Sequence, residues 1–142
     1  PRDDKIRPTH AFDLTYQASG AQQDQNILSF WVKSNKPLPE DDDLHREVLA
    51  YVSDYGLLFS ALLPHGYRFP TKSEFMRDFS LATIDHSIWY HQPVKADDWL
   101  YYQCVPISTS GARGLSRGSF IDQQGRLIAT TIQEGLMRKR QG

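Results

Sequence analysis

The residue with the clearest capacity for chemistry is Asp54, because it stands inside a long apolar stretch of the chain. Apolar side chains recur there at the three- and four-residue steps of a helix with one buried face: Leu44, Val48, Val52, Tyr55, Phe59 and Leu62. Asp54 lies off this stripe, but its helical neighbours are apolar too: Ala50, Tyr51, Leu57 and Leu58. A carboxylate buried among them loses its hydration unless hydrogen bonds or a partner offset the loss. Asp54 is therefore either a hydrogen-bonded structural residue or a general base.

One long helix is expected to carry Asp54, from about Leu44 to Leu63. The four acids of residues 40–43 precede it, where carboxylates accept hydrogen bonds from free amides and complement the positive end of the helix dipole. Pro64 and Gly66 are expected to end the helix. Because this helix is apolar nearly all round, it is predicted to lie in the core of the protein.

After a polar connection, the spacing of the apolar residues changes from that of a helix to the alternation of a strand. β-branched and aromatic residues also become frequent. Strands are predicted at Ile27 to Val32, Phe79 to Tyr90, Trp99 to Val105, Gly111 to Ile121 and Arg126 to Met137. Residues 122–125 are typical of a hairpin turn between the last two strands. Gly114 and Gly118 share one strand face, where they would admit a close neighbour. The pattern predicts an α+β protein of the hotdog fold, a long central helix wrapped by a mainly antiparallel β-sheet.

Composition and charge limit the kind of protein that this chain can be. Its 142 residues fit one domain, and 39% hydrophobic with 23% charged residues is ordinary for a globular protein. With a net charge of −1, the domain as a whole is not expected to attract nucleic acid electrostatically. No apolar run approaches the roughly 20 residues of a membrane span, and no signal peptide is expected. We therefore expect neither a membrane span nor secretion.

The cysteine and the histidines offer little for metal binding or nucleophilic catalysis. Cys104 is the single cysteine, which excludes an internal disulfide and a cysteine-cluster zinc site. No sequence feature near Cys104 indicates a lowered thiol pKa. His86 and His91 are five residues apart in a predicted strand and point to opposite faces, so they are not expected to share a metal. No metal site is predicted.

Several separate motifs, in order from about Ile27 to Arg138, resemble the second, C-terminal hotdog repeat of the acyl-CoA thioesterase II family. The motifs are Trp31-Val32-Lys33, Leu38-Pro39-Glu40-Asp41, Ala50-Tyr51-Val52-Ser53-Asp54, the segment from Thr83 to His91, and Thr131-Ile132-Gln133-Glu134-Gly135. Members of that family carry two hotdog repeats in tandem. The resemblance therefore implies that residues 1–142 are a single hotdog domain, the C-terminal half of a double-hotdog protein.

The resemblance also implies an activity, the hydrolysis of acyl-CoA thioesters to free fatty acid and coenzyme A. In the family, an Asp on the central helix activates a water molecule together with a Thr and a Gln of the sheet. Matched motif by motif, these residues are Asp54, Thr83 and Gln133. A carboxylate can accept the proton of the water, and a hydroxyl and an amide can hold the water in line with the thioester carbonyl. No cofactor is implied.

Partners and a compartment are implied as well. The substrate is an acyl-CoA, and a second hotdog domain, in the same chain or from a second copy, would complete the acyl tunnel and cover the open edge of the sheet. The family occurs in the bacterial cytoplasm and in peroxisomes, so we expect the peroxisomal matrix or the cytoplasm. The chain ends without the Ser-Lys-Leu peroxisomal signal.

Alternatives remain open for the base and for the function. Asp85 is a rival base, because alternation along a strand gives it the same orientation as Thr83. The run Asp85-His86-Ser87 is not expected to form a triad, since neighbours on a strand point to alternate faces. The domain could instead be a non-catalytic acyl-CoA-binding or dimerisation module. A hotdog enoyl-CoA hydratase is less favoured, because such hydratases carry a His five residues after the helical Asp, where this chain has Phe59.

Overall fold

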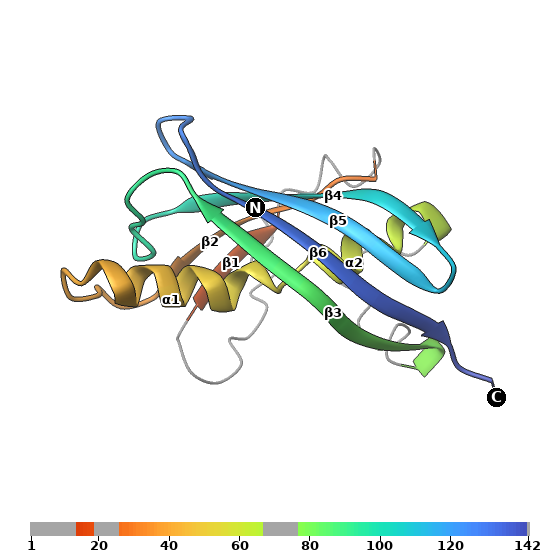
Figure 1. The fold of residues 1–142 in the computed structure, drawn as a ribbon. Coiled ribbons are helices and arrows are strands. Elements are labelled where there is room, and N and C mark those ends of the chain that lie inside the picture. Colours follow the sequence, from red (N-terminus) through yellow and green to blue (C-terminus); the bar gives the residue numbers. More distant parts are fainter. Residues whose placement is uncertain (1–13, 19–25, 67–76, 142) are drawn as a thin grey trace.

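A computed structural model of the chain describes residues 14–18, 26–66 and 77–141. Six strands of this described part form one antiparallel sheet in the order β1-β2-β4-β5-β6-β3, and the curled sheet wraps around α1 (Figure 1). The strands are β1 (Leu14–Ala18), β2 (Leu28–Ser34), β3 (Phe79–Tyr90), β4 (Leu100–Ser110), β5 (Arg113–Asp122) and β6 (Leu127–Lys139). The helices are α1 (Asp42–Ser53), α2 (Leu57–Ser60) and a single 3-10 turn at Leu63–His65. The predicted α+β hotdog fold is confirmed.

The helical region differs from the prediction, because it is broken in the middle. The break lies between α1 and α2 at Gly56, which has a left-handed φ of 92°. A Cβ at this position would lie 3.0 Å from the ring of Phe30, so the chain passes close against the sheet there. A left-handed residue cannot continue an α-helix, and the continuous helix expected from Leu44 to Leu63 is wrong. None of the described helices has the length and apolarity needed to cross a bilayer.

The acids before α1 play the expected capping role. Asp41 is the N-cap residue, and its Oδ1 accepts hydrogen bonds from the backbone amides of Asp43 (3.0 Å) and Leu44 (3.2 Å). Asp42 and Asp43 occupy the first turn, where a negative charge complements the helix dipole. The capping acids therefore need no catalytic explanation.

The core lies between α1 and the inner face of the sheet, and two glycines allow its elements to approach closely. Tyr102 stacks on Phe120 with ring centroids 3.8 Å apart. A Cβ on Gly118 would lie 2.3 Å from the Thr131 hydroxyl and 2.5 Å from the Tyr102 ring. A Cβ on Gly114 would lie 2.6 Å from the Cβ of Ala61, directly after α2. The close approach predicted for this glycine pair is confirmed.

We expect Gly118→Ala to lower the free energy of unfolding by about 1–3 kcal/mol, because Tyr102 and Thr131 must move to admit the methyl group. Thermal unfolding measures this, with Arg117→Ala on the exposed neighbouring position as the control. If the two variants had the same Tm, the close packing at Gly118 would be contradicted.

Candidate active site

Asp54 lies immediately after the last residue of α1 and forms the C-cap of that helix. Its side chain is exposed, because the helix ends before the apolar residues Leu57 and Leu58 that follow in sequence. The expected burial of Asp54 on a continuous apolar helix is therefore wrong. The carboxylate accepts a long hydrogen bond from Thr83 of β3, whose Oγ1 lies 3.4 Å from Oδ1. Two of the three candidate residues thus meet at the end of α1.

A β-bulge in β3 decides which side chains of this strand face the helix. Directly opposite residues on paired antiparallel strands share a face of the sheet. The register pairs Thr83 with Gly135, Asp85 with Glu134 and His86 with Gln133, and it leaves Ile84 as the extra residue. Because Gly135 and Gln133 are buried, Thr83 and His86 lie on the inner face. Asp85 lies on the outer face.

Asp85 is therefore not placed as a base beside Thr83. The expectation that the two side chains share an orientation is wrong, because the bulge inserts one residue between them and shifts the alternation of the strand. Asp85 is also exposed on the outer face. His86 points inward while Asp85 and Ser87 point outward, so these three neighbours do not form a triad.

Gln133 is buried on the inner face of β6, with 1% of its surface exposed. Its Oε1 is hydrogen bonded to Nδ1 of His86, and Nε2 of His86 lies 2.8 Å from the hydroxyl of Ser53. The amide Nε2 of Gln133 has no hydrogen-bond partner among the residues that the structure describes. The structure thus brings Gln133 to His86 and Ser53, and Asp54 follows Ser53 directly in the chain.

Sequence reasoning missed the contact that joins Ser53, His86 and Gln133. On a regular strand, Thr83 and His86 would face opposite sides, because they are three residues apart. Only the bulge at Ile84 brings them to the same face, and nothing in the sequence marks it. The sequence gives one indication that these residues matter. Ser53 lies in the same motif as Asp54, and His86 lies in the same motif as Thr83.

Tyr102 fixes the end of α1 to the sheet. Its hydroxyl lies 2.6 Å from the carbonyl oxygen of Ser53, to which it donates, and 2.8 Å from the hydroxyl of Thr131. Burial raises the pKa of Tyr102 well above its ordinary value, so the phenol keeps its proton and donates. The last carbonyls of a helix have no partner inside it, and this bond satisfies one of them. Tyr102 thereby holds the residue that precedes Asp54.

Cys104 is not placed to act as a nucleophile. Its side chain is buried, and burial raises the pKa of its thiol above the ordinary value. A thiol that keeps its proton is a poor nucleophile. Within the described residues, no group of three or more His, Cys, Asp or Glu side chains could hold a metal ion.

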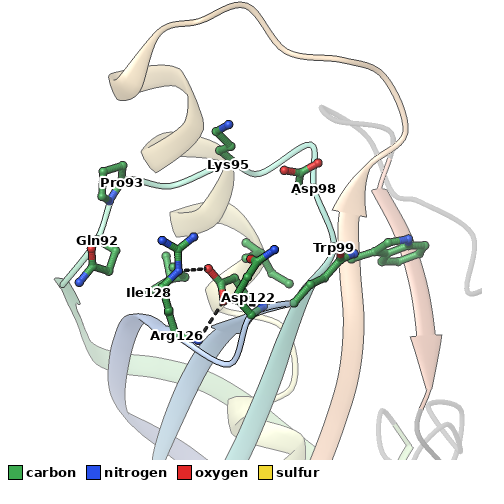
Figure 2. A pocket seen from close by; sticks show the side chains of 11 residues that line it. Gln92, Pro93, Lys95, Asp98, Trp99, Asp122, Arg126 and Ile128 are labelled. Atoms are coloured by element: carbon green, nitrogen blue, oxygen red, sulfur yellow. Dashed lines mark hydrogen bonds and ion pairs between the residues drawn. The ribbon is translucent and has the colours of Figure 1, made fainter.

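A cavity of about 260 Å³ lies between the β3–β4 connection and the β5–β6 hairpin, away from these residues (Figure 2). The charges at its wall stabilise the hairpin: Nε of Arg126 lies 2.7 Å from Oδ2 of Asp122, and Oδ1 of Asp122 accepts hydrogen bonds from two backbone amides of the turn. None of Asp54, Thr83 and Gln133 lines this cavity. The candidate active site is instead the arrangement at the end of α1, where the side chains of Thr83 and Asp54 meet.

The fold and this site define a hotdog protein with a carboxylate at the end of its central helix. The profile of the acyl-CoA thioesterase family matches residues 10–136, and the chain belongs to that family. The chain is 40% identical over 108 residues to acyl-CoA thioesterase 2 of Haemophilus influenzae and 41% identical over 135 residues to human acyl-coenzyme A thioesterase 8. It is 31% identical over 99 residues to a Saccharomyces cerevisiae protein named peroxisomal acyl-coenzyme A thioester hydrolase 1. These alignments cover 76, 94 and 68% of this chain but only 36, 39 and 27% of the relatives.

Solved structures agree with this relationship. The acyl-CoA thioesterase II TesB2 of Mycobacterium marinum has a TM-score of 0.73 at 29% identity, over 96% of this chain and 53% of that one. A tesB protein of Mycobacterium avium subsp. paratuberculosis has the same TM-score at 23% identity, over 88% of this chain and 47% of that one, which shows the shared fold. The chain thus spans about half the length of these structures.

Proposed function

We propose that this domain hydrolyses acyl-CoA thioesters to free fatty acid and coenzyme A, as the C-terminal half of a double-hotdog protein. The observation that carries the proposal is the contact between Asp54 and Thr83 at the end of α1. In the described part of the chain, the Asp54 carboxylate takes part in no ion pair, so it is available to accept a proton. Membership of the acyl-CoA thioesterase family supports the choice of substrate.

The proposed reaction is general-base hydrolysis. Asp54 accepts a proton from a water molecule while the water oxygen attacks the carbonyl carbon of the thioester. Thr83 holds the carboxylate through the hydrogen bond at 3.4 Å, which orients it toward the water. Gln133 offers its side-chain amide to the reacting centre as a hydrogen-bonding group. The carbon–sulfur bond then breaks, and the departing sulfur of coenzyme A takes up the proton held by Asp54.

One experiment separates this function from its alternatives. The full-length protein is incubated with an acyl-CoA while free thiol is measured, and with an enoyl-CoA while the enoyl absorbance is followed. We expect thiol release from the acyl-CoA and no hydration of the enoyl-CoA. Loss of the enoyl absorbance without thiol release would indicate a hydratase, against which Phe59 already counts because it packs against the core at the position of the hydratase histidine. Binding without either reaction would indicate a non-catalytic acyl-CoA-binding or dimerisation module.

The partner that we propose is a second hotdog domain, in the same chain or from a second copy, lying against β3. This strand is at the edge of the sheet and pairs only with β6 among the described strands. It carries two large exposed apolar side chains, Ile84 (49%) and Trp89 (51%). Long edge strands with exposed apolar residues are normally covered. A domain that covers this edge would also exclude bulk water from the exposed Asp54 and Thr83.

We expect this chain on its own to pair with a second copy at micromolar concentration. Light scattering should give about twice the 16.3 kDa of the chain. Ile84→Lys should shift the mass toward the monomer by placing a charge on the covered edge, whereas Leu127→Lys at the exposed start of β6 should not. A wild-type chain that stays monomeric would contradict the proposed pairing.

The compartment that we propose is the peroxisomal matrix or the cytoplasm. The name of the Saccharomyces cerevisiae relative supports the peroxisome for that protein. Fluorescence microscopy of the full-length protein, tagged away from its C-terminus, tests the assignment in its native cell. Export from the cell would overturn it.

A further inference from the structure

The side chain of Leu58 in α2 lies directly on Gly135 of β6. A Cβ on Gly135 would overlap with Cδ2 of Leu58, whereas the carbonyl oxygen of Ala82 would be at an ordinary contact distance of 3.4 Å. Among the described residues, Leu58 is therefore the side chain that fills the space above this glycine. The absence of a side chain at Gly135 allows α2 to place the leucine against the sheet.

Leu58 is adjacent to all three candidate catalytic residues. It follows Asp54 by four positions, across the break in the helix. Gly135, on which it lies, is directly opposite Thr83 of β3 and two residues beyond Gln133 on the inner face of β6. Directly opposite residues of antiparallel strands have Cα atoms about 4.5–5.5 Å apart. An acyl-CoA whose carbonyl carbon reaches these residues therefore comes to lie against Leu58.

Leu58 is also exposed enough to contact a ligand. It is half-buried, and it is not a member of either apolar cluster that forms the core of the described part. By contrast, Leu57 before it and Ala61 after it are fully buried members of those clusters. The exposed part of Leu58 is thus available to an apolar group beside the site.

The surface beyond Leu58 is apolar and indicates which part of the substrate lies there. Two residues after Gly135, on the same face of β6, is the buried Met137, and Leu81 of β3 lies directly opposite it. Leu81 is partly buried against the small apolar cluster that includes Met137. An acyl chain is apolar, whereas the pantetheine arm of coenzyme A carries amide groups that are costly to bury without hydrogen bonds. The acyl chain is therefore the part that fits this surface.

We propose that Leu58 is a specificity-determining residue that contacts the acyl group at the carbon next to the thioester carbonyl, and that its bulk disfavours acyl groups branched at this carbon. This proposal rests on the proposed thioesterase function. A branch at that carbon needs space beside the carbonyl, and the leucine side chain on Gly135 fills this space. Leu58 acts by packing alone and takes no part in proton transfer.

The test compares two isomeric acyl-CoA substrates of the full-length protein, one straight-chain and one with a methyl branch next to the carbonyl. Thiol release gives kcat/KM for each. Leu58→Ala removes most of the side chain and should raise the ratio of branched to straight-chain kcat/KM by about 10-fold or more, because one methylene in an apolar pocket is worth roughly 10–200-fold. Leu58→Val is a smaller truncation and should raise the ratio by less.

Leu115→Ala is the matched control for the truncation. Leu115 is half-buried like Leu58, but it lies opposite Glu134 on the outer face of the sheet. The same change from leucine to alanine at this position should leave the ratio as in the wild type.

Gly135→Ala tests the same contact from the side of the sheet. The added methyl group forces Leu58 away from β6 and disturbs the packing beside Thr83, so kcat/KM for the straight-chain substrate should fall by about 10-fold. Leu58→Ala in the same chain removes the overlap and should recover most of this loss.

The possible failures are distinguishable. A wild-type protein that releases no thiol from either substrate overturns the proposed function. If the wild type is active, the inference is overturned by a Leu58→Ala variant whose ratio matches that of Leu115→Ala, including one that loses activity equally toward both substrates. A double variant no more active than Gly135→Ala overturns it as well. If Leu58→Ala does not fold, the ratio of Leu58→Val decides in its place.

Discussion

Asp54→Asn is expected to lower kcat for acyl-CoA hydrolysis by roughly 10²–10⁴-fold, the usual range for loss of a general base. The asparagine keeps the size of the side chain and can still accept the hydrogen bond from Thr83, but it cannot accept a proton from water. KM should change little, because the base acts in the transition state and not in substrate recognition. Steady-state thiol release by the full-length protein measures both quantities. A normal kcat with a raised KM would mean that Asp54 only binds substrate.

Thermal unfolding is the control for this variant. Because Asp54 is exposed and takes part in no ion pair within the described residues, its replacement should leave Tm near that of the wild type. Thr83→Val extends the test, since it removes the hydroxyl that holds the carboxylate. Its effect should fall short of additivity with Asp54→Asn, because Thr83 acts through the carboxylate that Asp54→Asn removes.

Gln133→Ala is expected to lower kcat by about 10²–10³-fold, because it removes the side-chain amide that we propose as a hydrogen-bonding group at the reacting centre. It also leaves Nδ1 of His86 without a partner, which should lower the free energy of unfolding by about 1–3 kcal/mol. Kinetics and thermal unfolding must therefore be measured together, at a temperature where the variant is folded. Gln103→Ala on β4 is the matched control, since Gln103 lies opposite Ser119 and alternates with the buried Tyr102.

The kcat values of Gln133→Ala and Gln103→Ala should therefore differ by the whole of the expected roughly 10²–10³-fold. If Gln133→Ala lost no more activity than Gln103→Ala, the amide of Gln133 would have no part in the reaction.

Every strand of the sheet except β1 could be predicted from the sequence, because apolar and polar residues alternate along these strands. Phe79–Tyr90 is predicted with the bounds that β3 has, and the remaining predicted strands correspond to β2, β4, β5 and β6. The close packing at Gly114 and Gly118 was predictable for the same reason, since two glycines on one face leave room for a neighbour.

The helix was predicted at the right place but as one piece. Apolar periodicity does not distinguish one helix from two short segments that pack on the same sheet, and Gly56 alone carries the information that the chain turns. The break in the helix also changes the candidate active site. Asp54 caps the end of α1 and is exposed, whereas a continuous helix would bury it. Asp54 is therefore not desolvated, and its assignment rests on the motif and on its contact with Thr83.

The bulge at Ile84 could not be predicted, and it decides two assignments. It depends on how β3 pairs with β6, which is a contact between residues about fifty positions apart and leaves no local pattern. The bulge moves Asp85 to the outer face and brings His86 to Gln133. The sequence alone left Asp85 as a rival base for this reason.

The most direct test of the account compares two variants of the full-length protein, Asp54→Asn and Asp85→Asn, on the same acyl-CoA by thiol release. Both changes remove one carboxylate from an exposed position, Asp54 at the end of α1 and Asp85 on the outer face of β3. The account predicts that Asp54→Asn loses roughly 10²–10⁴-fold in kcat while Asp85→Asn stays near the wild type. Near-normal turnover by Asp54→Asn together with loss of activity in Asp85→Asn would contradict it and make Asp85 the base.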